Sequence, residues 1–217
     1  MTNSNESSDH EPPEWARSLS AAVGHLQSQS GPPPQQTGTP RAAAVLVLLT
    51  DGPNGVQVLL TERASGLRSY PGQVTFPGGA KDPTDVDPTA TALREAREEV
   101  GLNPASVHIL GSLPTTVDPK GKSTVTPVLA WSACSDLPGP VNPKEVAKVH
   151  RVAIRDLSAS RSTAQPSKES AALASQLGTM TAEIIDAVVA LLDAPTAKDP
   201  NEIQSELPRD RQPEGTK

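Results

Sequence analysis

The sequence predicts a sandwich of strands and helices, of the mixed α/β or α+β class. Two observations support this class: short apolar segments with strand character recur along the chain, and two helical segments interrupt or follow them. The chain has 217 residues, 23 of them proline, and only 2% are aromatic. These values suit one medium domain with tails, which we place at residues 41–194.

The first part of the domain has the pattern of a hairpin. Residues 42–50, AAAVLVLLT, form an apolar run typical of a buried strand, and DGPNG over residues 51–55 is a strong turn signal. Residues 56–63 then supply the partner strand. Residues 73–79 predict a short strand that runs into a loop. Further strands are expected at residues 107–115, 123–133 and 148–154, and an amphipathic helix at 181–194.

Both ends of the chain are polar and rich in residues that do not build a core. Residues 1–40 end in GPPPQQTGTP and predict a flexible arm, with one short helix at 14–27 where apolar residues recur at helical spacing. Residues 195–217 are charged and interrupted by proline, which predicts a disordered tail.

Composition disfavours several functional classes. The formal net charge of -6 disfavours a broad nucleic-acid surface, and no apolar segment is long enough to cross a membrane. The chain starts without a signal-peptide pattern, so we expect a cytoplasmic protein. Cys134 is its single cysteine, which excludes an intrachain disulfide and a cysteine zinc cluster and predicts a core thiol.

The stretch TALREAREEVGL contains the second predicted helix. Asp87 is a good N-cap, Pro88 suits the first helical position, and Gly101 suits the position just after the end, so the helix should span about residues 88–100. With ~100° between successive residues, its three glutamates share one face.

Those glutamates are badly placed for helix stability. Glu95 and Glu99 form a like-charged i,i+4 pair, which costs ~0.2–0.5 kcal/mol, and Glu98 joins them near the C-terminal end, where the helix dipole disfavours anions. A solvated charged face is one interpretation. The other is a site for Mg²⁺ or Mn²⁺, completed by substrate phosphates. The Gly78–Gly79 pair just before the helix favours the second, because it lets backbone approach a phosphate or a metal.

Residues 79–102 resemble the Nudix box, G-x5-E-x7-R-E-U-x-E-E-x-G-U, where U is aliphatic. The second half matches from Arg94 onward if alanine is allowed as U. In the first half, fourteen residues separate Gly79 from Arg94 instead of thirteen, and Asp85 or Val86 stands near the place of the first glutamate, whose role we expect Asp85 to take.

The preceding stretch LLTERASGLRSYPGQVTFPGG, residues 59–79, resembles a signature of the coenzyme A diphosphatase branch of the Nudix hydrolases. It matches nearly throughout, with Tyr70 where histidine is common. The resemblance covers about residues 41–155 and weakens afterwards. It implies a mixed β-sheet sandwiched between α-helices and metal-dependent hydrolysis of the pyrophosphate of coenzyme A, giving phosphopantetheine and adenosine bisphosphate.

The resemblance also assigns roles to the acidic helix. Glu95 and Glu99 are the expected main ligands of Mg²⁺ or Mn²⁺, because i,i+4 side chains stand closest together. Glu98 is expected to be a third ligand or to assist the base, Arg94 to orient Glu95, and the Gly79 carbonyl to approach the metal.

Residues outside the helix complete the predicted site. Arg63 and Arg68 are candidates for phosphate recognition, with surface arginines as the other interpretation. Glu145 is a candidate general base or an ordinary surface residue. Phe76 is expected to pack in the core and His150 to be structural.

Three functions remain open at this stage: coenzyme A hydrolysis, hydrolysis of another nucleoside diphosphate derivative such as ADP-ribose, or a non-catalytic Nudix-like binding module. The expected partner is a small nucleotide of the coenzyme A type, with no nucleic acid or membrane involved, and a homodimer is left open.

Overall fold

The computed structural model describes residues 11–29, 40–118, 121–133, 139–158 and 166–194. The predicted arm outside 11–29, the tail at 195–217 and Cys134 lie outside the described residues. The elements in chain order are α1 (Glu14–Gln29), β1 (Arg41–Thr50), β2 (Gln57–Arg63), β3 (Val74–Thr75), β4 (Gly78–Ala80), α2 (Pro88–Val100), the 3-10 turn η1 (Pro104–Ser106), β5 (His108–Ser112), β6 (Thr116–Val117), β7 (Ser123–Trp131), β8 (Val146–Ala153), α3 (Ile154–Leu157), α4 (Lys168–Gln176) and α5 (Thr179–Leu192).

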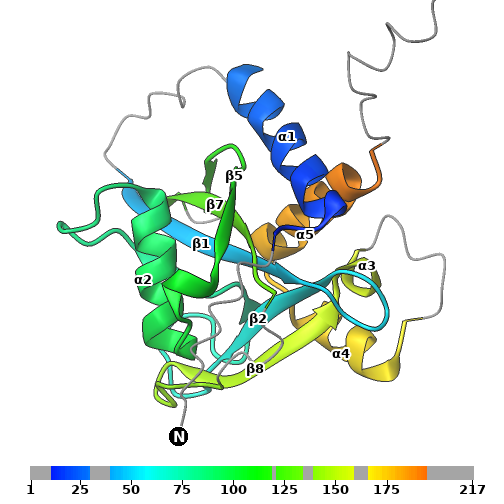
Figure 1. Ribbon diagram of the computed structural model, residues 1–217. Helices are drawn as coiled ribbons and strands as arrows, with labels where there is room; N and C mark the ends of the chain where they lie inside the picture. The colour runs from blue at the N-terminus through cyan, green and yellow to red at the C-terminus, as the bar shows by residue number, and fades with distance from the viewer. Residues whose placement is uncertain (1–10, 30–39, 119–120, 134–138, 159–165, 195–217) are drawn as a thin grey trace, which may run out of the picture.

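The strands form one mixed sheet with the order β3-β2-β1-β7-β5. Outside this path, β4 pairs with β1, β6 with β7 and β8 with β2. The long β1–β7 pair is parallel, from Arg41↔Ser123 to Leu49↔Trp131, and the other pairs are antiparallel. The β1 and β7 strands therefore form the centre of the molecule (Figure 1).

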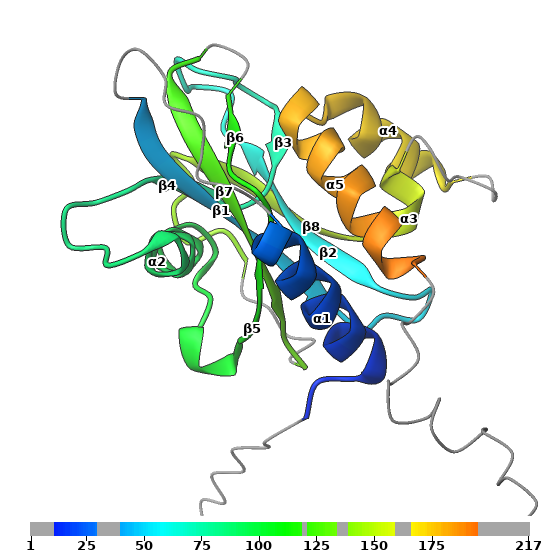
Figure 2. The ribbon, with the colours of Figure 1, turned by 90° about the horizontal axis from the view of Figure 1, so that it is seen from above.

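Helices cover both faces of this sheet, which confirms the predicted sandwich. Figure 2 shows α2 on one face and α1, α3, α4 and α5 on the other. Successive residues of β1 alternate between the two cores, as expected for a strand buried on both sides. Val45 and Leu49 join the cluster under α1 and α5, whereas Leu46 joins the cluster under α2.

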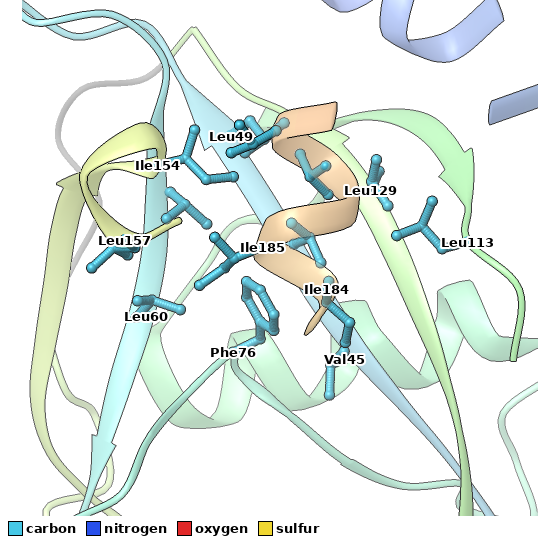
Figure 3. Packing of buried hydrophobic residues seen from close by; sticks show 14 of the residues in the cluster. Val45, Leu49, Leu60, Phe76, Leu113, Leu129, Ile154, Leu157, Ile184 and Ile185 are labelled. Carbon is cyan, nitrogen blue, oxygen red and sulfur yellow. The ribbon is translucent and has the colours of Figure 1, made fainter. Parts of the chain in front are cut away.

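The larger core lies under α5. Figure 3 shows Ile184 and Ile185 of α5 lying near Phe76, over the central strands. Phe76 is 2% exposed and belongs to this cluster, so its predicted role in packing is confirmed.

The predicted short helix in the arm is α1, and it packs on the sheet. Ala16, Leu19 and Val23 are fully buried. Asp51, at the end of β1, accepts two indole hydrogen bonds, one from Trp15 Nε1 (2.9 Å) and one from Trp131 Nε1 (3.2 Å). This carboxylate ties α1 to the sheet.

The predicted β1–β2 hairpin is present and pairs beside its turn, at Leu49↔Val58 and Thr50↔Gln57. In addition, β1 pairs with β7 and β2 with β8 along their lengths. One strand prediction needs correction. The strand predicted at 73–79 is divided into β3 and β4 by Pro77, which lacks the N–H that a continuous ladder needs. The helices α3 and α4 were not predicted. Among the described residues, no helix is long and apolar enough to cross a lipid bilayer.

Candidate active site

The acidic helix has the boundaries that its capping residues predict. The Asp87 side chain accepts a hydrogen bond from the Ala90 N–H at 2.8 Å, and Pro88 is the first helical residue. Gly101 adopts the left-handed conformation (φ 69°, ψ 24°), and its N–H donates to the Arg97 carbonyl at 3.0 Å. Ala92, Ala96 and Val100 are buried against the sheet, which sets the orientation of the helix.

Glu99 connects this helix to the glycine pair. Its side chain is largely buried, at 6% exposure, and its Oε2 accepts a hydrogen bond from the Gly78 N–H at 3.1 Å. Gly78 also packs tightly against β1, since a Cβ there would lie 2.5 Å from the Ala44 carbonyl oxygen. Only glycine fits between the strand and the helix at this position.

Glu95 contacts the next glycine. A Cβ on Gly79 would lie 2.5 Å from Glu95 Oε1 and 2.8 Å from its Oε2. The carboxylate therefore rests on the bare Cα of Gly79. The two glycines, which begin β4 instead of forming the expected loop, hold Glu95 and Glu99 side by side.

Arg94 organises the acidic side chains around it. Its Nη1 donates to Glu95 Oε1 at 3.0 Å and to Glu98 Oε2 at 3.4 Å, and its Nη2 donates to the Ala80 carbonyl at 3.0 Å. Two further hydrogen bonds go to Asp85: Nε donates to Oδ1 at 3.1 Å, and Nη2 donates to Oδ2 at 3.0 Å. The predicted orienting contact between Arg94 and Glu95 is present.

Asp85, and not Val86, occupies the site at the front of the box. Asp85 is 8% exposed and also accepts the Asp82 N–H at 2.9 Å, whereas Val86 is 84% exposed. The Arg94 guanidinium holds the pKa of the Asp85 carboxyl well below its usual range, and Asp85 in turn raises the pKa of Arg94. The pair is thus fully charged at neutral pH.

Burial raises the pKa of both Glu95 and Glu99, in contrast to the lowered pKa of Asp85. It raises the pKa of Glu99 to about 7, with the Gly78 N–H acting against the shift and the Glu95 carboxylate adding to it. Burial also raises the pKa of Glu95, opposed by Arg94. Two carboxylates that share a poorly solvated space gain from a cation between or beside them.

The fit to a divalent metal rests on two of the three glutamates. Glu98 is 53% exposed and turned toward Arg94. Within the described ranges, no three His, Cys, Asp or Glu side chains are grouped closely enough to hold a metal by themselves. Mg²⁺ is commonly bound by one or two carboxylates, with substrate phosphates and water completing the shell. Glu95 and Glu99 fit that pattern, and the three-glutamate ligand set stays a prediction.

A cleft of about 410 Å³ opens on the α5 side of the glycine pair. Gly78, Gly79 and Arg63 line it, while Arg68 lies exposed in the following loop and is not among the described lining residues; the role of the two arginines in phosphate recognition stays a prediction. Glu95 and Glu99 do not line the cleft themselves; they contact Gly78 and Gly79, which do.

Two cations of the cleft were missed from the sequence. Arg41 begins β1 and Lys122 precedes β7, and the Arg41 N–H donates to the Lys122 carbonyl at 3.1 Å. Nothing in their local sequence distinguishes them from other surface cations. Their proximity follows from the parallel β1–β7 pair.

The two remaining candidates differ in their location. Glu145 is exposed in the turn before β8, and its charge adds to the raised pKa of both Glu95 and Glu99, so it lies close enough to the site to act on them electrostatically. His150 Nε2 lies 3.3 Å from Glu62 Oε2, on the neighbouring strand, consistent with the expected structural role.

Comparison with known proteins agrees with this architecture. The family model of the NUDIX domain matches residues 40–173. A protein of Photorhabdus laumondii named as the uncharacterised Nudix hydrolase NudL is 41% identical over 140 residues, covering 64% of this chain and 73% of that protein. A protein of the same name from Cronobacter sakazakii is 45% identical over 116 residues, 54% of this chain and 59% of that protein.

Solved structures share the fold at low identity. The Nudix hydrolase RenU of M. smegmatis aligns with a TM-score of 0.51 and 22% identity, over 73% of this chain and 90% of that one. An Ap4A hydrolase of C. elegans aligns with a TM-score of 0.51 and 20% identity, over 70% and 97%. At these identities the likeness concerns the fold alone.

Proposed function

This chain belongs to the Nudix family of hydrolases, and we propose that it hydrolyses the pyrophosphate bond of coenzyme A or its derivatives, giving phosphopantetheine and adenosine bisphosphate. The observation that carries the proposal is the contact of Gly78 and Gly79, at the start of β4, with Glu95 and Glu99 at the edge of a cleft lined by Arg63. One short segment thus brings a candidate metal site next to a candidate phosphate site.

A pyrophosphate substrate accounts for the charges on both sides of this segment. Nudix hydrolases generally use divalent metal ions such as Mg²⁺ or Mn²⁺, and here Glu95 and Glu99 would hold the ion. Bound there, the metal would neutralise phosphate charge and lower the pKa of the attacking water. Arg94 keeps Glu95 in place, and Arg63 offers a guanidinium fork for phosphate oxygens.

The remaining acids are candidates for moving the proton. Glu145 stands in an exposed turn and acts electrostatically on Glu99, which suits a general base supplied by a loop. Glu98, bound to Arg94, is available as a further ligand or as an aid to that base.

The charge of the cleft supports coenzyme A over ADP-ribose. Arg41, Arg63 and Lys122 line it with Asp118 as the one acid among the described lining residues, so its formal charge is +2 on a chain of net charge -6. Coenzyme A carries a third phosphate group outside its pyrophosphate, which two additional cations would accommodate.

Product analysis tests the proposal. The full chain is incubated with Mg²⁺ or Mn²⁺ and, in parallel, coenzyme A, ADP-ribose and diadenosine polyphosphates, and the products are identified by chromatography and mass. We expect phosphopantetheine and adenosine bisphosphate from coenzyme A at the highest kcat/KM. No turnover of coenzyme A with either metal would refute the assignment.

A further inference from the structure

A second hollow, of about 370 Å³, lies along α5 beyond the charged cleft. The α5 side chains Met180, Ile184 and Leu191 form one wall, and Leu113 and Pro127 from the sheet side form the other. Glu183 is its one charged residue among the described lining residues, and none of them is aromatic. We call this hollow the apolar groove.

The apolar groove adjoins the charged cleft. Met180 lines both of them. Val125 in the cleft and Pro127 in the groove stand two residues apart on β7, so their side chains lie on the same face of the sheet. A ligand that passes Met180 therefore leaves charged surroundings and enters aliphatic ones.

Much of the groove is built by parts of the chain outside the shared domain. The family model ends at residue 173, whereas α5 begins at Thr179 and Leu26 of α1 precedes residue 40. Figure 2 shows α1 and α5 on the same face of the sheet, away from α2. Because the glycine pair and Arg63 lie inside the matched region, the groove is suited to a part of the substrate that differs between members of the family.

The chemistry of the groove selects an alkyl chain. A nucleobase in a protein site is commonly stacked on an aromatic ring and hydrogen-bonded at its edge. The groove offers aliphatic side chains, which gain from removing methylene groups from water. On the premise of the proposed function, we infer that the apolar groove binds the acyl chain of an acyl-coenzyme A thioester whose pyrophosphate lies at Gly78 and Gly79, so that acylated coenzyme A is preferred over the free thiol.

A single substitution can fill the groove without disturbing the core. Ala187 is exposed on α5 and lines the groove, so Ala187→Trp should occupy the space of the chain. Ala171→Trp on α4 is the matched control, because that alanine is also exposed and helical but does not line the groove. Circular dichroism checks that both variants fold.

The test compares coenzyme A with decanoyl-coenzyme A. We expect kcat/KM for the decanoyl thioester to exceed that for coenzyme A by about tenfold in the wild-type protein and in Ala171→Trp, since a few buried methylenes account for such a ratio. Ala187→Trp should reduce the ratio to near one and leave the coenzyme A value unchanged. A wild-type ratio near one, or a tenfold ratio that is unchanged in Ala187→Trp, would overturn the inference. Neither result would affect the proposal that the protein hydrolyses coenzyme A.

Binding provides a readout that does not depend on catalysis. Calorimetric titration in EDTA should give a Kd for decanoyl-coenzyme A about tenfold below that for coenzyme A, and this difference should vanish in Ala187→Trp. Equal affinities in the wild-type protein would overturn the inference. If neither thioester nor coenzyme A is hydrolysed with either metal, the proposed function fails separately, and the titration still decides whether the groove binds the chain.

Discussion

Glu99→Gln should stabilise the metal-free protein while it abolishes hydrolysis. Glu99 is 6% exposed, and burial raises the pKa of its carboxyl from 4.5 to about 7. Above pH 7 the native protein therefore carries a charge that the fold disfavours. Glutamine has nearly the same shape, and its amide oxygen can still accept the Gly78 N–H that Glu99 accepts at 3.1 Å.

The magnitude follows from the difference between the two pKa values. Between 4.5 and about 7 the folded state binds a proton that the unfolded state releases, so the free energy of unfolding falls as pH rises through this window. A difference of about 2.5 pH units corresponds to about 3 kcal/mol. The wild-type protein should lose this amount between pH 4.5 and 7, and the variant should not.

Urea unfolding in EDTA measures the effect. At pH 8 we expect Glu99→Gln to be about 3 kcal/mol more stable than the wild-type protein, and at pH 4.5 the two should nearly coincide. Glu98→Gln is the matched control, because Glu98 lies on the same helix but is 53% exposed, and such surface ion pairs contribute ~0–1 kcal/mol. Activity with Mn²⁺ should be lost in Glu99→Gln.

Two results would contradict this reasoning. If Glu99→Gln is no more stable than the wild-type protein at pH 8 in EDTA, the carboxylate is not disfavoured by burial. If the variant keeps full activity, Glu99 does not hold the metal.

Added Mn²⁺ should raise the stability of the wild-type protein and leave that of the variant almost unchanged, because the ion supplies the positive charge that the buried Glu99 carboxylate lacks.

Three further changes test other contacts of the site. Gly79→Ala should lower kcat by about 10²-fold with a small change in Tm, because the new Cβ would lie 2.5 Å from Glu95 Oε1 and displace that carboxylate; unchanged kinetics would show that the position of Glu95 is not critical. Arg94→Ala should lower the free energy of unfolding at pH 7, since it removes the guanidinium that pairs with the Asp85 carboxylate at 3.0 Å; an unchanged midpoint in urea titrations would speak against that pairing. Lys122→Ala should reduce kcat/KM for coenzyme A about tenfold more than for 3′-dephospho-coenzyme A, as expected for a cation that binds the third phosphate; equal losses on both substrates would exclude that role.

Local sequence was sufficient to predict the acidic helix. Asp87 and Gly101 act within one turn of the helix ends, so their capping roles depend on neighbouring residues alone. The i,i+4 spacing likewise places Glu95 and Glu99 together on any regular helix. The two motifs on either side of Gly79 indicated the family, and the mixed sandwich followed from the order of strands and helices.

Long-range packing determined what these side chains do. The sequence indicated Asp85 for the place of the first glutamate, but it could not show that Arg94 binds this carboxylate, because that contact forms only after the loop has folded back. The burial of Glu99 and its raised pKa depend on how closely the glycine pair approaches α2. Neither distance is determined by neighbours in the chain.

Strand pairing also separates what local sequence predicts from what long-range packing determines. The turn at residues 51–55 was correctly predicted, yet β1 pairs mainly with β7, about 80 residues away in the sequence. That parallel pair brings Arg41 to Lys122, and the packing of α1 and α5 on the same sheet builds the apolar groove. The sequence by itself determined the helix, its caps and its row of carboxylates, because those depend on short-range geometry. The tertiary structure alone decided which carboxylates are buried, which cations share the cleft and where an alkyl chain fits, because these depend on contacts between distant segments.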